Sequence, residues 1–189
     1  SDVYKRQVIN MTLSSFYLLD FPNTFNGIIP IYDSKHLDMG VKEALCTLNT
    51  LGIQINEDKV RYFIKTHQEM EELHESASGL CIPTVFKTYD IWVLEDLPYV
   101  YFKSVLAHEL GHVWLFENEI KLNDMECEGF CQLLSHQILF SDFALNSNSE
   151  ARIVAARTDE IYGDGFRLMK RKLDTLGWQQ LLILLKYDI

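Results

Sequence analysis

Basic residues are scarce in this sequence. Its 189 residues include 17 Lys and Arg against 27 Asp and Glu, which gives a formal net charge of -10. Binding to nucleic-acid phosphates requires a basic surface that displaces counterions. The charge balance therefore argues against a nucleic-acid partner.

Long apolar runs and disulfide-type cysteine spacings are missing too. The longest strongly apolar run, residues 181–185, is far shorter than the roughly 20 residues that span a bilayer, so we expect no membrane association. Four scattered cysteines are too few for a disulfide framework in a chain of this length. Reduced thiols are typical of the cell interior, and we expect a cytoplasmic protein.

Glycine and proline are few as well, and no linker, repeat or low-complexity stretch interrupts the chain. Residues 1–7 resemble a translated transposon end or sequencing adapter, so we expect them to be a non-native leader. The length suits one ordinary domain, which we expect over residues 8–189. We expect an N-terminal α/β part at about 8–98 and the active-site and C-terminal helices at about 99–189.

Hydrophobic periodicity predicts a mixed α+β fold. Apolar residues three or four apart predict a helix over residues 34–51, and the polar stretch 67–76 is also helix-prone. Strands are predicted over residues 28–32, 59–65, 80–86 and 89–94. After Pro98 a helix of about five turns is predicted by an apolar stripe. The stripe consists of Phe102, Leu106, Leu110, Val113 and Phe116.

Further helices are predicted after this one. Asn123 and Glu126 resemble a capping box, so we expect a second helix to begin there and to run through residue 140. Ser149 can begin a third helix. Gly177 ends the helical pattern that follows, and residues 178–186 are predicted to form a short last helix.

The predicted long helix carries a His-Glu-Leu-Gly-His run from His108 to His112. Residues four apart in a helix lie about 40° apart around its axis and about 6 Å apart along it, so both histidines face one way. Two such imidazoles can bind one tetrahedral Zn²⁺, and Glu109 then lies beside the metal, where a general base is needed. The alternative is a surface helix that happens to contain two histidines. Gly111 is costly inside a helix and indicates close approach of another backbone or of a ligand.

A catalytic zinc ion usually takes three protein ligands and leaves its fourth position for water. The zincin class that has a third His six residues after the second is excluded, because Asn118 stands at that position. Our preferred third ligand is Glu128, in the first turns of the next predicted helix. Its alternative role is that of a solvated carboxylate stabilised by the positive end of that helix.

Other candidate ligands stay open at this point. They are Glu117, Glu119, Glu126 and His136. If the helix continues, Glu117 points away from the histidines and Glu119 lies about 10 Å further along the axis. Glu126 suits the helix cap better, and a core or supporting role is more common for a lone histidine. Cys127 and Cys131 are also four apart, but structural thiolate sites need paired short spacings of four ligands, which favours core thiols.

Three ordered motifs resemble the DA-one-like peptidase domain. They are AHELGHVWL at residues 107–115, EGFCQ at 128–132 followed by His136, and YGDGFR at 162–167. The resemblance covers about residues 80–180. That domain forms the C-terminal part of plant organ-size regulators, which carry LIM and ubiquitin-interacting segments upstream and act as ubiquitin-activated zinc endopeptidases.

The resemblance implies a zincin-like fold of the gluzincin type with one catalytic Zn²⁺. It implies that His108, His112 and Glu128 are the zinc ligands and that Glu109 is the catalytic base. Cys127 departs from the second acidic residue that the family pattern leads us to expect there. The chain has no LIM-type Cys/His cluster, so we do not transfer ubiquitin dependence to it.

We therefore expect a zinc metallopeptidase that hydrolyses peptide bonds in a protein or peptide substrate, with Glu109 moving the proton of the attacking water. Tyr162 is a candidate donor to the developing oxyanion, and its alternative role is to pack a helical turn. By analogy with related folds, residues 89–94 are expected to pair with an extended substrate. The alternatives are a catalytically silent protein-binding module and a regulatory protease that cuts a single repressor.

Overall fold

The computed structural model describes residues 31, 34–74, 76–141 and 147–187, with the backbone only for 147–150. The expected leader at residues 1–7 lies outside the described residues. So does the strand expected over 28–32, apart from Ile31. That residue is fully buried, and its N–H donates to the carbonyl of Leu97 at 3.0 Å.

Helices make up most of the described chain, and three strands form one small sheet. The helices are α2 (Ser34–Thr50), α3 (His67–Leu73), α4 (Tyr99–Glu117), α5 (Asp124–Ser141), α6 (Ser147–Ala155) and α7 (Gly165–Tyr187), with short turns η2 (Glu57–Lys59) and η3 (Glu160–Asp164). The strands are β1 (Val60–Lys65), β2 (Gly79–Pro83) and β3 (Tyr89–Leu94). The expected α+β class is confirmed, and none of the helices described is long and apolar enough to cross a membrane.

The sheet has the strand order β1-β3-β2. β3 runs parallel to β1, with Tyr89 opposite Val60, and antiparallel to β2, with Val93 opposite Gly79. Both edges of β3 are therefore occupied, and the expectation that residues 89–94 pair with a substrate is wrong. Among the described strands, β2 is the edge strand on the side of the candidate site, because β1 lies across β3 from it.

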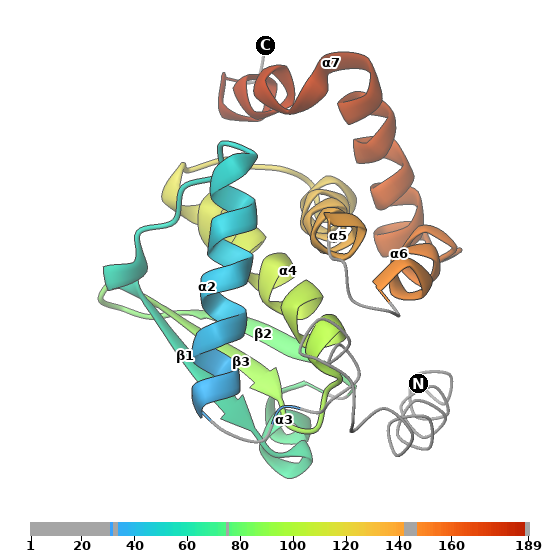
Figure 1. Cartoon of the computed structure of the whole chain (residues 1–189). Coiled ribbons are helices and arrows are strands. Elements are labelled where there is room, and N and C mark those ends of the chain that lie inside the picture. Colours follow the sequence, from blue (N-terminus) through green and yellow to red (C-terminus); the bar gives the residue numbers. More distant parts are fainter. Residues whose placement is uncertain (1–30, 32–33, 75, 142–146, 188–189) are drawn as a thin grey trace.

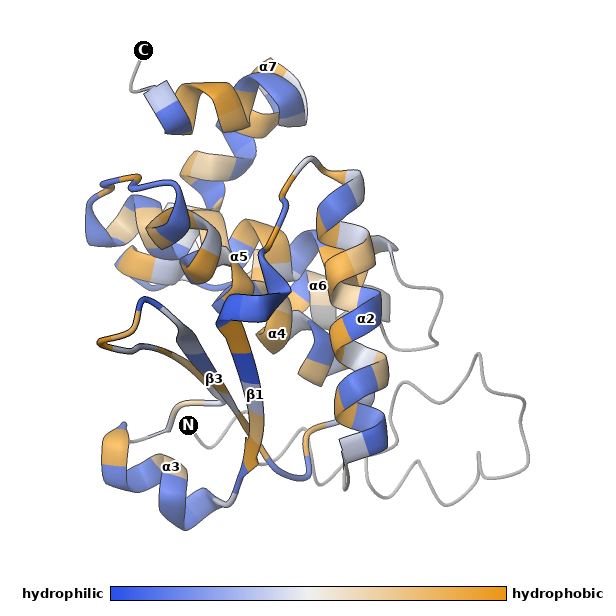
Figure 2. Cartoon of the chain, turned by 90° about the vertical axis from the view of Figure 1, so that its left-hand side faces the viewer, coloured by the Kyte–Doolittle hydropathy of each residue, from blue (hydrophilic) through white to orange (hydrophobic). Residues whose placement is uncertain are grey.

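Helix α4 is the centre of the fold (Figure 1). It contacts β2 and β3 on one side and α5 on the other, while α2 also packs on it and α7 packs on α5. Phe102, Leu106 and Leu110 are fully buried, as the apolar stripe predicts. Phe116, the last member of that stripe, departs from the prediction, because it is 49% exposed although one face of its ring stacks on Tyr89. In Figure 2 the largely hydrophilic α3 lies beyond the ends of the strands, away from these packed helices.

Glycines allow the helices to approach closely where α5 is packed. A Cβ added at Gly111 would lie 2.9 Å from Sγ of Cys131 on α5 and 3.4 Å from its Cα, so what approaches Gly111 most closely is a side chain of the neighbouring helix rather than the expected backbone or ligand. Gly129 on α5 faces the backbone of Gly165, the first residue of α7, too closely for any side chain. Gly177 has φ 73° and bends α7, so a last helical segment follows it, as predicted.

Replacing Gly129 with Ala tests this crossing of α5 and α7. The added methyl group would overlap the backbone of Gly165, which cannot move as a side chain can. We expect Gly129→Ala to lower the free energy of unfolding by about 1–3 kcal/mol in chemical denaturation. Asn49→Ala, on the exposed side of α2, is the control and should change it by less than about 0.5 kcal/mol. Equal stability of Gly129→Ala and the unaltered protein would contradict the packing described here.

Candidate metal centre

Helix α4 presents His108 and His112 on one side, toward α5. Their ring centroids are 5.1 Å apart. The side chains are 13% and 16% exposed, so each ring is largely buried but reaches the surface of a pocket. The helical spacing of four residues places the two imidazoles together, as the sequence predicts.

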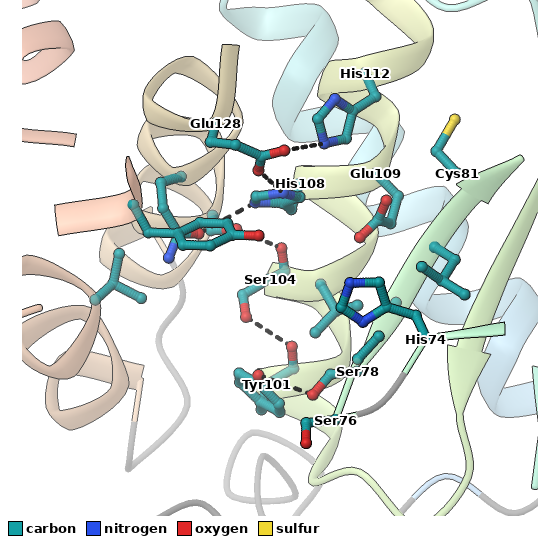
Figure 3. A pocket seen from close by; sticks show the side chains of 18 of the residues that line it. His74, Ser76, Ser78, Cys81, Tyr101, Ser104, His108, Glu109, His112 and Glu128 are labelled. Atoms are coloured by element: carbon teal, nitrogen blue, oxygen red, sulfur yellow. Dashed lines mark hydrogen bonds and ion pairs between the residues drawn. The ribbon is translucent and has the colours of Figure 1, made fainter. Parts of the chain in front are cut away.

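Glu128 reaches both histidines from the second turn of α5. One of its carboxylate oxygens lies 3.0 Å from Nε2 of His108, and the other lies 3.6 Å from Nε2 of His112. Figure 3 shows the carboxylate facing both rings. Burial would raise the pKa of Glu128, but the hydrogen bond and charge of His108 and the charge of His112 outweigh it and lower this pKa. The structure thus brings together the three residues that the sequence singled out as ligands.

The other ring nitrogens of the two histidines have partners of their own. Nδ1 of His108 lies 3.1 Å from Oε1 of Gln132, and Nδ1 of His112 lies 3.6 Å from Sγ of Cys127. Such contacts fix the ring orientation and leave Nε2 of both rings directed at Glu128. Sequence reasoning missed the role of Gln132, although it follows Glu128 by four residues and therefore shares its helix face.

Cys127 and Cys131 lie in the same turns of α5 as Glu128. Burial alone would lower the pKa of His112, but the contact with Cys127 and the charges of Glu109 and Glu128 raise it overall. Hydrogen bonding to Cys131 is the main cause that lowers the pKa of Cys127 to about 5, aided by His112. Cys127 therefore contacts the site directly, which the expectation of a core thiol did not foresee.

Cys131 forms a donor set with the same histidines, and among the described residues it is this set, not the one with Glu128, whose three donor atoms lie close enough together for one ion. Its Sγ and one nitrogen of each ring all lie within 4.8 Å of one another, which is compatible with metal binding. However, Cys131 is fully buried beneath α4, and burial raises the pKa of its thiol. It also does not line the pocket, whereas Glu128 does. The two donor sets therefore differ in access, because Glu128 lines the pocket and Cys131 does not.

Glu109 lies beside the histidines and on the side of α4 that faces the sheet (Figure 3). Its carboxylate accepts a hydrogen bond from the backbone N–H of Cys81 on β2. The absence of a side chain at Gly79 makes room for it, because a Cβ there would lie 2.8 Å from Oε1 of Glu109. Burial raises the pKa of Glu109, and the charges of the two histidines offset part of this effect. Glu109 is thus held next to the three-residue cluster without belonging to it.

Tyr162 approaches the cluster from the turn η3. Asp159 caps that turn by accepting from the N–H of Tyr162 at 2.7 Å. The Tyr162 ring centroid lies 6.3 Å from that of His108. Burial, aided by the charge of Glu128, raises the pKa of the Tyr162 hydroxyl, so it stays protonated and able to donate at neutral pH. The guanidinium of Arg157 lies over the Tyr162 ring, with its central carbon 4.4 Å from the ring centroid.

These groups line one pocket with a volume of about 660 Å³. One wall is formed by β2 from Gly79 to Cys81, and the floor is formed by α4. Glu128 and Tyr162 lie on the opposite wall. His74 also points into the pocket, below Glu109 (Figure 3). A volume of this size is typical of a ligand-binding or active-site cleft.

The remaining candidate ligands are occupied elsewhere. Glu117 accepts from Nζ of Lys59 at 2.6 Å and from the hydroxyl of Tyr89 at 2.7 Å. Glu119 follows the end of α4 with φ 55°, so it is not on the helix face of the histidines. Neither Glu117 nor Glu119 lines the pocket that contains the cluster.

Glu126 and His136 also have structural partners. The N–H of Glu126 donates to Oδ1 of Asn123 at 2.9 Å, which confirms the expected cap at the start of α5, and its carboxylate pairs with Lys172 at 3.0 Å. The ring of His136 packs against Phe166, with ring centroids 5.0 Å apart. His136 does not line the pocket, in keeping with the core role that sequence reasoning favoured for it.

Comparison with known families gives one match. The family model described as DA1-like, Protein DA1, matches residues 34–158, which is more than half of the chain. The match begins at α2, well before the motifs that carry the resemblance in the sequence, and it ends before Tyr162. No curated protein and no solved structure matches the chain significantly.

Replacing Glu117 with Gln tests its structural role. The hydrogen bond and charge of Lys59, with the hydroxyl of Tyr89, lower the pKa of Glu117. A carboxylate with a lowered pKa in the folded state stabilises the fold at neutral pH, and this contribution is lost as the pH falls through that pKa. We expect Glu117→Gln to cost about 1 kcal/mol at pH 7, a modest value because the side chain of Lys59 is 39% exposed.

The pH dependence and a control complete this prediction. Chemical denaturation at acidic pH, where the carboxylate is protonated, should give the same stability for Glu117→Gln and the unaltered protein. Glu71→Gln, on the exposed side of α3, should leave stability unchanged at both pH values. Equal stability of Glu117→Gln and the unaltered protein at pH 7 would contradict the structural role of Glu117.

Proposed function

The chain belongs to the DA1-like family, and from the geometry of its pocket we propose that it is a zinc-dependent peptidase of the gluzincin type. The proposal is supported above all by one observation, which is that Nε2 of His108 and Nε2 of His112 face the same carboxylate of Glu128 at 3.0 and 3.6 Å. The substrate we propose is a peptide bond in a protein or peptide. The reaction adds one water molecule across that bond and yields a carboxylate and a protonated amine.

The donor set fits a catalytic zinc ion. Two imidazole nitrogens and one carboxylate oxygen are a known ligand combination for catalytic zinc, which keeps an open position beside three protein ligands. Gln132 on Nδ1 of His108 is the kind of partner that fixes a histidine ligand in its productive orientation. The alternative set with Cys131 is enclosed by the core, as suits a structural site rather than a catalytic one. We therefore propose that His108, His112 and Glu128 hold one catalytic zinc ion.

Zinc, when bound, supplies a Lewis acid that polarises the scissile carbonyl and makes water more acidic. The carboxylate of Glu109 takes one proton from the attacking water while the water oxygen bonds to the carbonyl carbon. As the C–N bond breaks, Glu109 delivers this proton to the leaving nitrogen. The hydrogen bond from the N–H of Cys81 keeps the carboxylate in place through both transfers. The protonated hydroxyl of Tyr162 donates to the oxygen on which negative charge develops.

The edge of β2 is the proposed docking edge for the substrate backbone. Gly79, Leu80 and Cys81 line the pocket, and β2 pairs with β3 on one side only among the described strands. An extended peptide can add to such an edge through backbone hydrogen bonds. Its scissile bond would then lie between Glu109 on the sheet side and Tyr162 on the opposite wall.

The two possible donor sets predict different effects on metal content. If Glu128 is the third ligand, Glu128→Ala should lose most of its bound zinc, because one charged donor is removed. Cys131→Ser, which changes the buried thiol by one atom, should keep a stoichiometric amount. Zinc per protein is measured by inductively coupled plasma mass spectrometry after dialysis, with folding checked by circular dichroism. Loss of zinc in Cys131→Ser with retention in Glu128→Ala would assign the metal to the enclosed set.

Glu109→Gln separates catalysis from binding. Since Glu109 lies outside the ligand cluster, this variant should keep its zinc but lose peptide cleavage by at least about a hundredfold. Cleavage of a denatured protein and of a peptide library, followed by mass spectrometry, provides the measurement. If both proteins hold zinc and neither cuts, the chain is a catalytically silent binding module. Cleavage at one sequence only would identify a regulatory protease of narrow specificity.

A further inference from the structure

Arg157 provides the pocket with a permanent positive charge. Among the described residues that line the pocket, it is the only Lys or Arg. The other charged groups of the lining are the carboxylates of Glu109 and Glu128 and the histidines. A guanidinium keeps its charge at all physiological pH values. We therefore ask which ligand the Arg157 guanidinium in this pocket could bind.

The side chain of Arg157 is held in a fixed position. Its Nε donates to Oδ2 of Asp159 at 2.9 Å, and its guanidinium carbon lies 4.4 Å from the ring centroid of Tyr162. Its backbone carbonyl accepts from Nη1 of Arg167 at 2.6 Å. Asp159 is fixed in turn, because it caps η3. The guanidinium is therefore oriented before any ligand arrives, which reduces the entropy lost on binding.

The two terminal nitrogens of the Arg157 guanidinium, Nη1 and Nη2, can still donate hydrogen bonds. Arginine has five N–H donors, and Asp159 occupies the one on Nε. Within the part of the chain that the structure describes, Nη1 and Nη2 donate to no acceptor, although the guanidinium charge acts on Glu128 and helps to lower its pKa. The Arg157 side chain is 34% exposed, so this end is partly shielded from water yet reachable. Two parallel N–H groups of this kind match the two oxygens of a carboxylate.

We infer that Arg157 recognises a carboxylate of the substrate, either an acidic side chain or a free C-terminus, next to the bond that is cut. The inference rests on the proposed peptidase function and adds a substrate class to it. The Tyr162 ring lies between Arg157 and the histidine cluster. Its centroid is 6.3 Å from that of His108 and 4.4 Å from the guanidinium carbon of Arg157. A carboxylate elsewhere in this pocket meets Glu109 or Glu128, and the chain as a whole carries a charge of -10. Arg157 gives the position beside the Tyr162 ring a fixed positive charge that favours an anion there.

Arg157 also has a possible role that involves no substrate. Its stacking on Tyr162 can serve only to hold that ring in place, in which case Arg157 is a positioning residue. The two roles differ in what they depend on. Recognition of a carboxylate depends on the charge of the substrate, whereas positioning of Tyr162 affects every substrate in the same proportion.

Three matched peptide sets test the inference on the zinc-loaded protein. The first contains N-acetylated hexapeptide amides with one Glu fixed at each position in turn, and the second contains the same peptides with Gln. The third contains neutral peptides with a free C-terminal carboxylate. We expect the unaltered protein to favour a carboxylate set over the Gln set by roughly tenfold or more in kcat/KM, mainly through KM. Preference for the first set assigns an acidic side chain, and preference for the third assigns the C-terminus.

Arg157→Gln should bring this preference close to one, and Arg157→Lys should restore part of it because it keeps the charge but not the planar fork. A proportional fall of cleavage in all three sets, with the preference intact, would overturn the inference in favour of positioning. So would the absence of any carboxylate preference in the unaltered protein. Zinc content and thermal unfolding of both variants verify that the site and fold persist.

A binding measurement separates this inference from the proposed function. Fluorescein-labelled members of the Glu and Gln sets, and of the neutral set with the free C-terminus, are titrated into Glu109→Gln with and without Arg157→Gln, and fluorescence polarisation is read. A carboxylate preference in binding that depends on Arg157, with no cleavage by the unaltered protein, would refute the peptidase function and keep the recognition site. Cleavage by the unaltered protein with no carboxylate preference in binding would support the peptidase function and refute the recognition site at Arg157.

Discussion

The close packing of α5 on α4 at Gly111 is the constraint on which the candidate site depends. Glu128 reaches two imidazoles on a neighbouring helix, and Gly111 leaves room for α5 to pack on α4 beside them. Gly111 precedes His112 directly, and Sγ of Cys131 occupies the space where a Cβ would be, at 2.9 Å. A similar contact between Gly129 and Gly165 fixes α5 against the start of α7. That second contact holds η3, with Tyr162, against the same end of α5.

The surroundings shift the pKa values of the two pocket carboxylates, Glu128 and Glu109, in opposite directions. Glu128 lies between two histidines, whose hydrogen bond and charges lower its pKa despite burial. Glu109 lies against β2, where burial is the dominant effect and raises its pKa. A carboxylate that favours its charged form suits a cation ligand, and one that binds a proton more readily suits proton transfer. The roles that we propose for the two carboxylates therefore suit the two walls of the pocket on which they lie.

Much of the local structure was predictable from the sequence, because helices and strands leave a period that a single chain displays. The helix of the histidines, the strand over residues 89–94 and the break at Gly177 all follow from such patterns. Glu128 was the preferred partner of the histidines because it lies in the first turns of the next helix, and the family resemblance implied the same residue; its contact with His108 agrees with that choice. The order of the strands was not, because β3 takes its place between β1 and β2 through pairings of residues far apart in the chain. Gln132 and Arg157 escaped sequence reasoning for the same reason, since their roles depend on partners in other elements.

The most direct test of the account is an anomalous difference map at the zinc absorption edge from crystals of the zinc-loaded protein. The account predicts one strong peak at roughly 2.0–2.2 Å from Nε2 of His108, from Nε2 of His112 and from a carboxylate oxygen of Glu128, on the side open to the pocket. A peak bonded to Sγ of Cys131 beneath α4, or no peak near the two histidines, would contradict it.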